Sequence, residues 1–114
     1  MKKVLIVEDE RRWQDLWRRW LDDKVVIVSA FSIEEAEEQF AANPDIVAIV
    51  MDACVPGDRP TTPSLVQKLR STFTGPMIAA SSMSDYRRRL LAAGCDHESV
   101  KEEVPQMLLE ILGL

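Results

Sequence analysis

Short, wholly apolar runs alternate with longer amphipathic segments along the chain, and this alternation restricts the fold more than any other feature. The runs cover residues 4–7, 25–28, 46–51 and 77–80, and each has the length of a strand and no polar position. A strand without a polar face is buried on both sides, as in a parallel sheet covered by helices. A fifth, weaker strand is expected within residues 95–100, where the sequence has little strand character.

The segments between these runs predict five helices. The first covers residues 10–22, the second follows Ser32 and ends at Asn43-Pro44, and the third begins at Pro63. The fourth is capped by Ser84 or Asp85 and runs through Ala93, and the last covers about 102–112. Ser32 and Glu35 have the spacing of a capping box, and Gly94 is suited to a left-handed helix stop. The alternation predicts an α/β chain with one parallel sheet and helices on both faces.

Two helices carry side chains that suggest surfaces. We expect the apolar side chains of the first helix to face the core, and they are Trp13, Leu16, Trp17, Trp20 and Leu21. Because three tryptophans are bulky for one face, one of them is a candidate for an exposed partner contact. In the fourth helix the run 87–89 predicts a solvated arginine face, with a homodimer contact or an acidic partner as the alternatives.

The length and charge of the chain argue against several classes of protein. Its 114 residues are enough for one domain, residues 1–114. A net charge of −5 argues against a nucleic-acid binder, which needs a basic face. No apolar run approaches the ~20 residues that span a membrane, and the first run is too short for a signal peptide. We therefore expect a cytoplasmic protein in which Cys54 and Cys95 are free thiols.

Acidic, hydroxyl and amine side chains follow the predicted strands. Glu8 and Asp9 follow the first run, Asp52 follows the third, and Ser81 follows the fourth. Lys101 follows the weak fifth segment. In an open α/β sheet the ligand site lies beyond the carboxyl ends of the strands, so these side chains should converge at one edge. Crowded carboxylates raise one another's pKa, and a hard cation such as Mg²⁺ removes that penalty.

These residue types suggest phosphoryl transfer. A carboxylate such as that of Asp52 can attack a phosphoryl group and form an acyl phosphate. Mg²⁺ and Lys101 would neutralise the charge that spreads over the phosphoryl oxygens in a loose transition state. The Ser81 hydroxyl can donate a hydrogen bond to a phosphoryl oxygen once it is present, which supplies a local switch.

Four motifs resemble the receiver domain of two-component response regulators over essentially the whole chain. They read VLIVEDE at residues 4–10, IVMDACVPG at 49–57, PMIAASS at 76–82 and AGCD…K at 93–101. The resemblance implies a flavodoxin-like, doubly wound (βα)5 three-layer sandwich with a parallel five-stranded sheet in the order 2-1-3-4-5.

The resemblance also implies a role for each matching residue. Asp52 matches the phosphoacceptor, and Glu8 and Asp9 match the acidic metal-binding pair, with Asp9 as the more direct ligand. Cys54 stands where the family lends a backbone carbonyl to the Mg²⁺ that Asp52 also binds. Ser81 matches the switch hydroxyl, and Lys101 matches the lysine of the pocket.

The resemblance implies that the chain acts as a stand-alone regulator, since no output domain follows Leu114. Its phosphoryl donor is expected to be a sensor histidine kinase or a histidine phosphotransfer protein, and its output a further protein partner. Such a domain catalyses only its own phosphorylation and dephosphorylation and is not a conventional enzyme. Neither a nucleic acid nor a membrane is expected as a partner.

Two substitutions depart from the family pattern. Glu98 stands where the family usually has Tyr or Phe, the rotating partner of the switch hydroxyl. Glu102 replaces the proline that usually follows the lysine, often across a cis bond. Because a cis bond to a non-proline residue costs ~3 kcal/mol, we expect a trans bond or a remodelled loop. These departures keep open an alternative, a pseudo-receiver that binds protein without being phosphorylated.

A small α/β enzyme is a third candidate with less support. No glycine-rich phosphate loop follows the first strand, and Glu8-Asp9-Glu10 there would repel a cofactor phosphate. A phosphohydrolase would need a second aspartate two residues after Asp52, where Cys54 stands.

Overall fold

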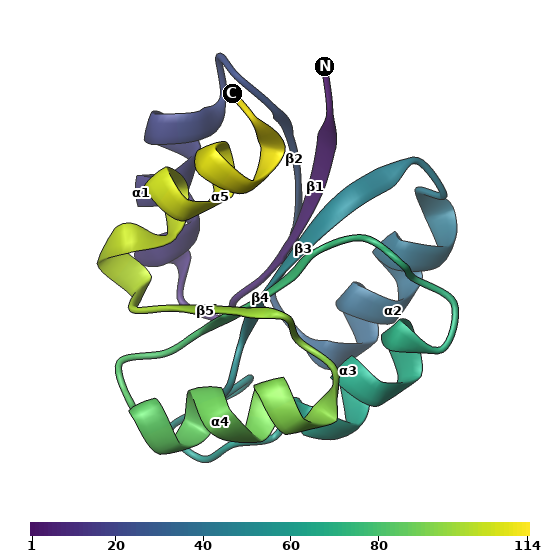
Figure 1. The fold of residues 1–114 in the computed structure, drawn as a ribbon, viewed down its shortest axis with the longest axis vertical. Helices are drawn as coiled ribbons and strands as arrows, with labels where there is room; N and C mark the ends of the chain where they lie inside the picture. Colours follow the sequence, from purple (N-terminus) through teal and green to yellow (C-terminus); the bar gives the residue numbers. More distant parts are fainter.

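Five parallel strands form one sheet in the order β2-β1-β3-β4-β5 (Figure 1). The computed structural model describes all 114 residues. The strands are β1 (Lys3–Val7), β2 (Val26–Ala30), β3 (Ile46–Asp52), β4 (Met77–Ala80) and β5 (His97–Ser99). The predicted strand positions, parallel pairing and order are confirmed, and the weak fifth strand is three residues long.

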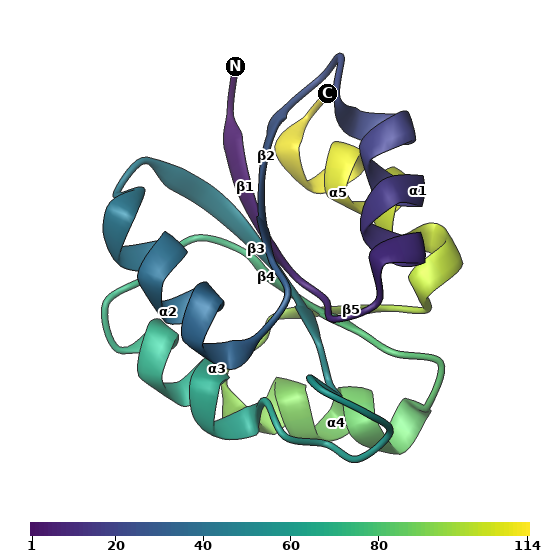
Figure 2. The same ribbon diagram turned by 180° about the vertical axis from the view of Figure 1, so that it is seen from behind.

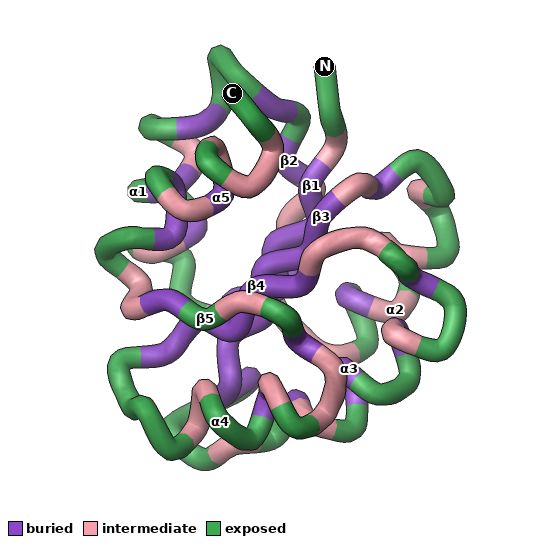
Figure 3. Tube along the Cα trace, in the orientation of Figure 1, coloured by how far each residue is buried: buried purple, intermediate pink, exposed green.

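The helices cover both faces of the sheet (Figures 1 and 2). One layer contains α1 (Arg11–Leu21) and α5 (Val104–Leu112), and the other contains α2 (Ile33–Ala42), α3 (Pro63–Arg70) and α4 (Ser84–Ala93). Successive strand residues point to opposite faces, so Val4 and Ile6 pack in one apolar cluster while Leu5 and Val7 pack in the other. The central strands are therefore buried on both sides, as Figure 3 shows.

The structure confirms some of the predicted helix ends and contradicts others. The Ser32 hydroxyl accepts a hydrogen bond from the Glu35 N–H at 3.1 Å, which confirms the predicted cap. The predicted cap at Ser84 or Asp85 is wrong, because α4 begins at Ser84 itself and Met83 is the N-cap residue. Gly94 ends α4 with a φ of 142°, a positive value outside the left-handed helical region expected for it.

The buried face of α1 differs from the predicted one. Trp17 and Leu21 are fully buried, but Leu16 and Trp20 are exposed, Trp20 by 62 %. Gln14 takes the remaining core position, and its amide donates to the carbonyls of Ile6, Glu8 and Ala30 at the ends of β1 and β2. The buried Gln14 amide is thus satisfied by three backbone carbonyls, which explains how a polar residue is accommodated in the core.

The segment after β5 is remodelled as expected. Lys101–Glu103 form one turn of 3₁₀ helix, and the Lys101–Glu102 peptide bond is trans. The last α-helix therefore begins at Val104, two residues later than the predicted start. None of the helices combines the length and apolar character needed to cross a membrane.

Candidate functional site

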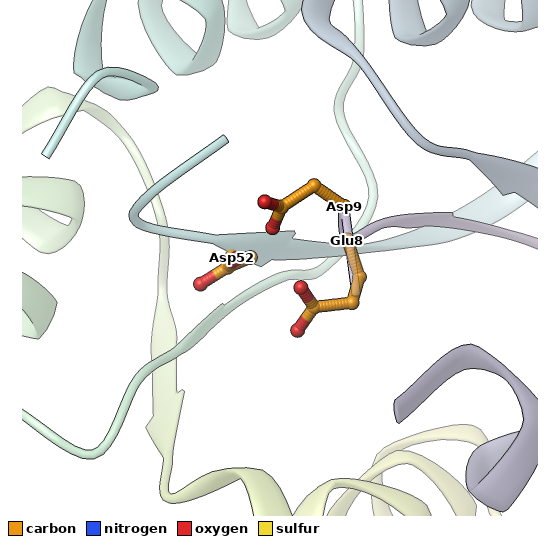
Figure 4. A group of neighbouring side chains, drawn as sticks. All are labelled: Glu8, Asp9 and Asp52. Carbon is orange, nitrogen blue, oxygen red and sulfur yellow. The ribbon is translucent and has the colours of Figure 1, made fainter. Parts of the chain in front are cut away.

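Three carboxylates meet where β1 and β3 end (Figure 4). β1 pairs with β3 so that Val7 lies opposite Met51, which places Glu8 and Asp9 beside Asp52, the last residue of β3. One carboxylate oxygen from each of the three lies within 4.8 Å of the others. The convergence predicted from the strand ends is therefore present in the structure.

Lys101 joins this cluster from the other side of the sheet edge. Its ammonium nitrogen lies 2.7 Å from Glu8 Oε1 and 3.4 Å from Asp52 Oδ1, and its side chain is only 14 % exposed. One positive charge thus contacts two of the three carboxylates. The lysine is placed there because it follows β5, whose partner β4 lies next to β3.

Glu8 is the most deeply buried of the acidic groups. It is fully inaccessible to solvent, its Oε2 accepts from the Glu10 N–H at 3.1 Å, and its Oε1 faces the Lys101 ammonium. Burial first, and then the charge of Asp52, raise the pKa of Glu8 from 4.5 to about 8. The carboxyl is consequently protonated up to neutral pH as long as no other cation neutralises the pocket.

Asp52 and Lys101 influence one another's ionisation. Burial raises the pKa of Asp52 above its usual range, and the Lys101 ammonium opposes that rise. Burial alone would lower the pKa of Lys101, but its hydrogen bond to Glu8 and the charge of Asp52 raise that pKa overall. The lysine therefore stays charged in the pocket, where it can stabilise negative charge that develops on Asp52 or on a group bound to it.

Asp9 faces the loop that follows β3. It is only half-buried, and its Oδ2 accepts from the Gly57 N–H at 3.2 Å. Gly57 has a φ of 88°, a conformation that favours glycine and lets the loop backbone approach Asp9. Partial exposure leaves Asp9 open to a solvated ion, in contrast to the enclosed Glu8.

Two threonines that the sequence did not single out hold this loop in place. Thr61 Oγ1 donates to the Val55 carbonyl at 2.8 Å and accepts from the Val55 N–H. Thr62, fully buried, donates to the carbonyl of Asp52 at 2.8 Å. Their only signal in the sequence is their place just before the helix-starting Pro63, which does not distinguish them from ordinary loop residues.

A shallow pocket of about 180 Å³ opens above Asp52. Ser81 and Lys101 line it with Asp52, and the other lining residues are Glu10, Cys54, Gly57, Asp58, Ser82, Met83 and Tyr86. The Ser81 oxygen accepts from the Met83 N–H at 3.1 Å, so the hydroxyl proton remains free to donate.

Cys54 takes part in the site through its backbone. Its N–H donates to Asp52 Oδ1 at 3.4 Å. Burial raises the pKa of the Cys54 thiol to about 11, which leaves the sulfur unreactive.

The donor set fits a hard divalent cation. Asp9 and Asp52 offer carboxylate oxygens at the mouth of the cluster, whereas Glu8 lies deeper and is matched by Lys101. Oxygen ligands that leave positions open for water suit Mg²⁺. A cation bound between Asp9 and Asp52 would also relieve the repulsion that the acidic cluster creates.

We predict that Mg²⁺ raises the melting temperature of the chain. An ion that binds only the folded state stabilises it by mass action, by about 2.7 kcal/mol when its concentration is a hundred times the Kd. Differential scanning fluorimetry across a Mg²⁺ series checks this, with NaCl of matched ionic strength as the control. The Asp9→Asn variant should lose most of the shift, and an equal shift in wild type and variant would contradict the site.

Arg87 and Glu98 form an ion pair at the position where the sequence departs from the family pattern. Arg87 Nε lies 2.8 Å from Glu98 Oε1, and Arg87 Nη1 donates to the Ser81 carbonyl at 2.7 Å. The predicted solvated face is therefore wrong for Arg87, whose side chain is 15 % exposed, although Arg88 and Arg89 are exposed as expected. The reason is that α4 packs against the end of β4, which brings Arg87 over Ser81.

Comparison with known proteins identifies the fold. No protein-family model matches the sequence, and no curated protein does. A two-component response regulator from Clostridium difficile is similar over 99% of this chain and 97% of its own, with a TM-score of 0.84 and 21% identity. The chemotaxis protein CheY4 of Vibrio cholerae has a TM-score of 0.81 and 23% identity over 99% of this chain and 97% of its own.

A third similar structure contains a modified aspartic acid and a bound metal ion. It is a response regulator from Burkholderia pseudomallei with a phosphorylated aspartic acid, a calcium ion and citrate. It matches 98% of this chain and 66% of its own, with a TM-score of 0.82 and 17% identity. Together with the strand order 2-1-3-4-5 and the five helices, these likenesses show that the chain has the fold of response-regulator receiver domains.

Proposed function

We propose that the chain is a phosphoacceptor receiver in which Asp52 takes a phosphoryl group in the presence of Mg²⁺. The observation that carries this proposal is the Lys101 ammonium, which contacts both Glu8 and Asp52 beside Asp9 at the carboxyl edge of the sheet. The phosphorylated aspartic acid and calcium ion of the Burkholderia protein support the same chemistry for a chain of this fold.

The residues of the pocket support such a transfer. A carboxylate oxygen of Asp52 attacks the phosphorus of a phosphohistidine or a small acyl phosphate, and the bond from phosphorus to the leaving nitrogen or oxygen breaks. Lys101 neutralises charge on the transferred group, and Ser81 donates its free proton to one of the phosphoryl oxygens. When bound, Mg²⁺ would balance the remaining charge on the phosphoryl oxygens, held by Asp9, Asp52 and the Cys54 carbonyl.

The proposal also implies which proteins supply the phosphoryl group and read the phosphorylated state. A sensor histidine kinase or a histidine phosphotransfer protein in the cytoplasm supplies the phosphoryl group, and a downstream protein reads the phosphorylated state. The chain promotes only its own phosphorylation and dephosphorylation, so it acts as a switch and not as a conventional enzyme. A homodimer through α4 is compatible with the exposed Arg88 and Arg89.

Incubation with acetyl phosphate and Mg²⁺, followed by intact-protein mass spectrometry, tests the proposal. We expect the mass to rise by one phosphoryl group, and we expect EDTA to prevent the rise because the transfer depends on the cation. Hydroxylamine should release the group, since it attacks acyl phosphates. An unchanged mass of the folded wild-type chain in the presence of Mg²⁺ would overturn the proposal.

One observation favours a second candidate, a pseudo-receiver that binds protein independently of phosphorylation. The Arg87–Glu98 pair ties α4, Ser81 and β5 together, where a mobile aromatic side chain is usual in the family. If that pair holds the output face in a single state, the face can bind a partner without a phosphoryl signal. Binding of Mg²⁺ without any gain of a phosphoryl group would favour this candidate.

A further inference from the structure

Two tryptophans of α1 contact Lys101, one through its backbone and the other through its ammonium group. Trp17 is fully buried, and its indole N–H donates to the backbone carbonyl of Lys101 at 3.0 Å. The ring of Trp13 lies with its centroid 5.7 Å from the Lys101 ammonium nitrogen. The centroids of the two rings lie 5.7 Å apart at an interplanar angle of 32°, so the two tryptophans also contact each other.

The backbone direction at Lys101 is set without a proline after the lysine. The next residue is Glu102, and Lys101 begins a single turn of 3₁₀ helix. Its carbonyl accepts both the Val104 N–H of that turn and the Trp17 indole N–H, so two donors fix its direction. Trp17 thereby ties the start of the turn to α1.

The side chain of Lys101 also has an alternative to the pocket. Glu102 and Glu103 are exposed carboxylates on the same turn, and a lysine side chain is long and has four rotatable bonds. The face of an aromatic ring attracts an ammonium group. The Trp13 ring therefore favours the observed conformation, in which the ammonium contacts the carboxylates of Glu8 and Asp52 and also lies over the ring.

We propose that Trp17 and Trp13 are positioning residues for Lys101, Trp17 through the backbone and Trp13 through the ammonium. This inference rests on the proposed phosphoacceptor function of Asp52. Neither tryptophan lines the pocket above Asp52, so each acts on the phosphoryl group only by way of the lysine.

The Trp17→Phe variant removes the indole N–H and keeps an aromatic ring in the core. We expect its rate of phosphorylation by acetyl phosphate to fall about tenfold, because small misplacement of a catalytic group is costly. The Trp13→Leu variant should be about threefold slower, in line with the loss of one cation–π contact. Both variants should still bind Mg²⁺, because neither tryptophan is among the residues that line the pocket with Asp52.

A matched control separates positioning from general destabilisation. Leu21 is fully buried in the same apolar cluster and lies one helical turn beyond Trp17 on the same helix. Leu21→Ala should lower the melting temperature at least as much as Trp17→Phe and leave the phosphorylation rate at the wild-type value. Hydrogen exchange gives an independent readout, since the indole N–H of Trp17 should be protected while that of the exposed Trp20 exchanges freely.

The outcomes are distinct. Slow phosphorylation of Trp17→Phe with normal Mg²⁺ binding and a normal rate for Leu21→Ala supports the inference. A wild-type rate in Trp17→Phe, or an equal slowing in Leu21→Ala, overturns it and leaves the proposed function intact. A wild-type chain that gains no phosphoryl group overturns the proposed function, and the inference falls with it.

Discussion

The Asp52→Asn variant is expected to gain no phosphoryl group under conditions that load the wild-type chain, a loss of more than about a hundredfold in rate. The amide has the shape of the carboxylate but is a poor nucleophile, and it offers a weaker ligand to the cation that the acidic cluster would hold. Intact-protein mass spectrometry after incubation with acetyl phosphate and Mg²⁺ measures the difference.

Asp58→Asn is the matched control for this experiment. Asp58 lines the same pocket but is exposed and lies on the loop after β3, outside the group of three carboxylates. It should load like the wild type. Asp52→Asn is also expected to stay folded, because it removes a buried carboxylate that is costly to ionise. Equal loading of Asp52→Asn and wild type would show that another residue accepts the phosphoryl group.

The second large effect is a fall in the stability of the metal-free chain as the pH rises. Between pH 4.5 and about 8 Glu8 is ionised in the unfolded chain but protonated in the folded pocket, so the folded state binds more protons. The stabilisation present below pH 4.5 is therefore lost as the pH rises through the folded pKa of about 8. At ~1.4 kcal/mol per pKa unit the loss is several kcal/mol.

Glu8→Gln removes most of this dependence. Glutamine is neutral in both states, so the variant should match the wild type near pH 4.5 and be more stable than it above pH 8. Some slope should remain because burial also raises the pKa of Asp52. Urea unfolding in EDTA at a series of pH values measures the two curves, and exposed Glu34→Gln should follow the wild type. A wild-type stability that rises steadily over this range would contradict the burial of Glu8 as a proton-binding group.

The sequence by itself determined the layers of the fold and the composition of the pocket. Short apolar runs without a polar position favour strands covered on both sides, and the order of strands and helices leaves few arrangements open. Because parallel strands end at one edge, the residues after each run, including Asp9, Asp52 and Ser81, had to meet there. This reasoning needs only local pattern and the direction of the chain.

Only the tertiary structure decided which side chains support that pocket. Periodicity assigned Leu16 and Trp20 of α1 to the core, but Gln14 is buried there instead, and its amide donates to carbonyls at the ends of β1 and β2. The sequence predicted a solvated Arg87, but the packing of α4 brings its guanidinium into contact with the Ser81 carbonyl and the Glu98 carboxylate. Contacts such as these, and that of Trp17 with Lys101, join residues far apart in the chain. They depend on how helices and strands pack, which no local pattern of apolar and polar residues encodes.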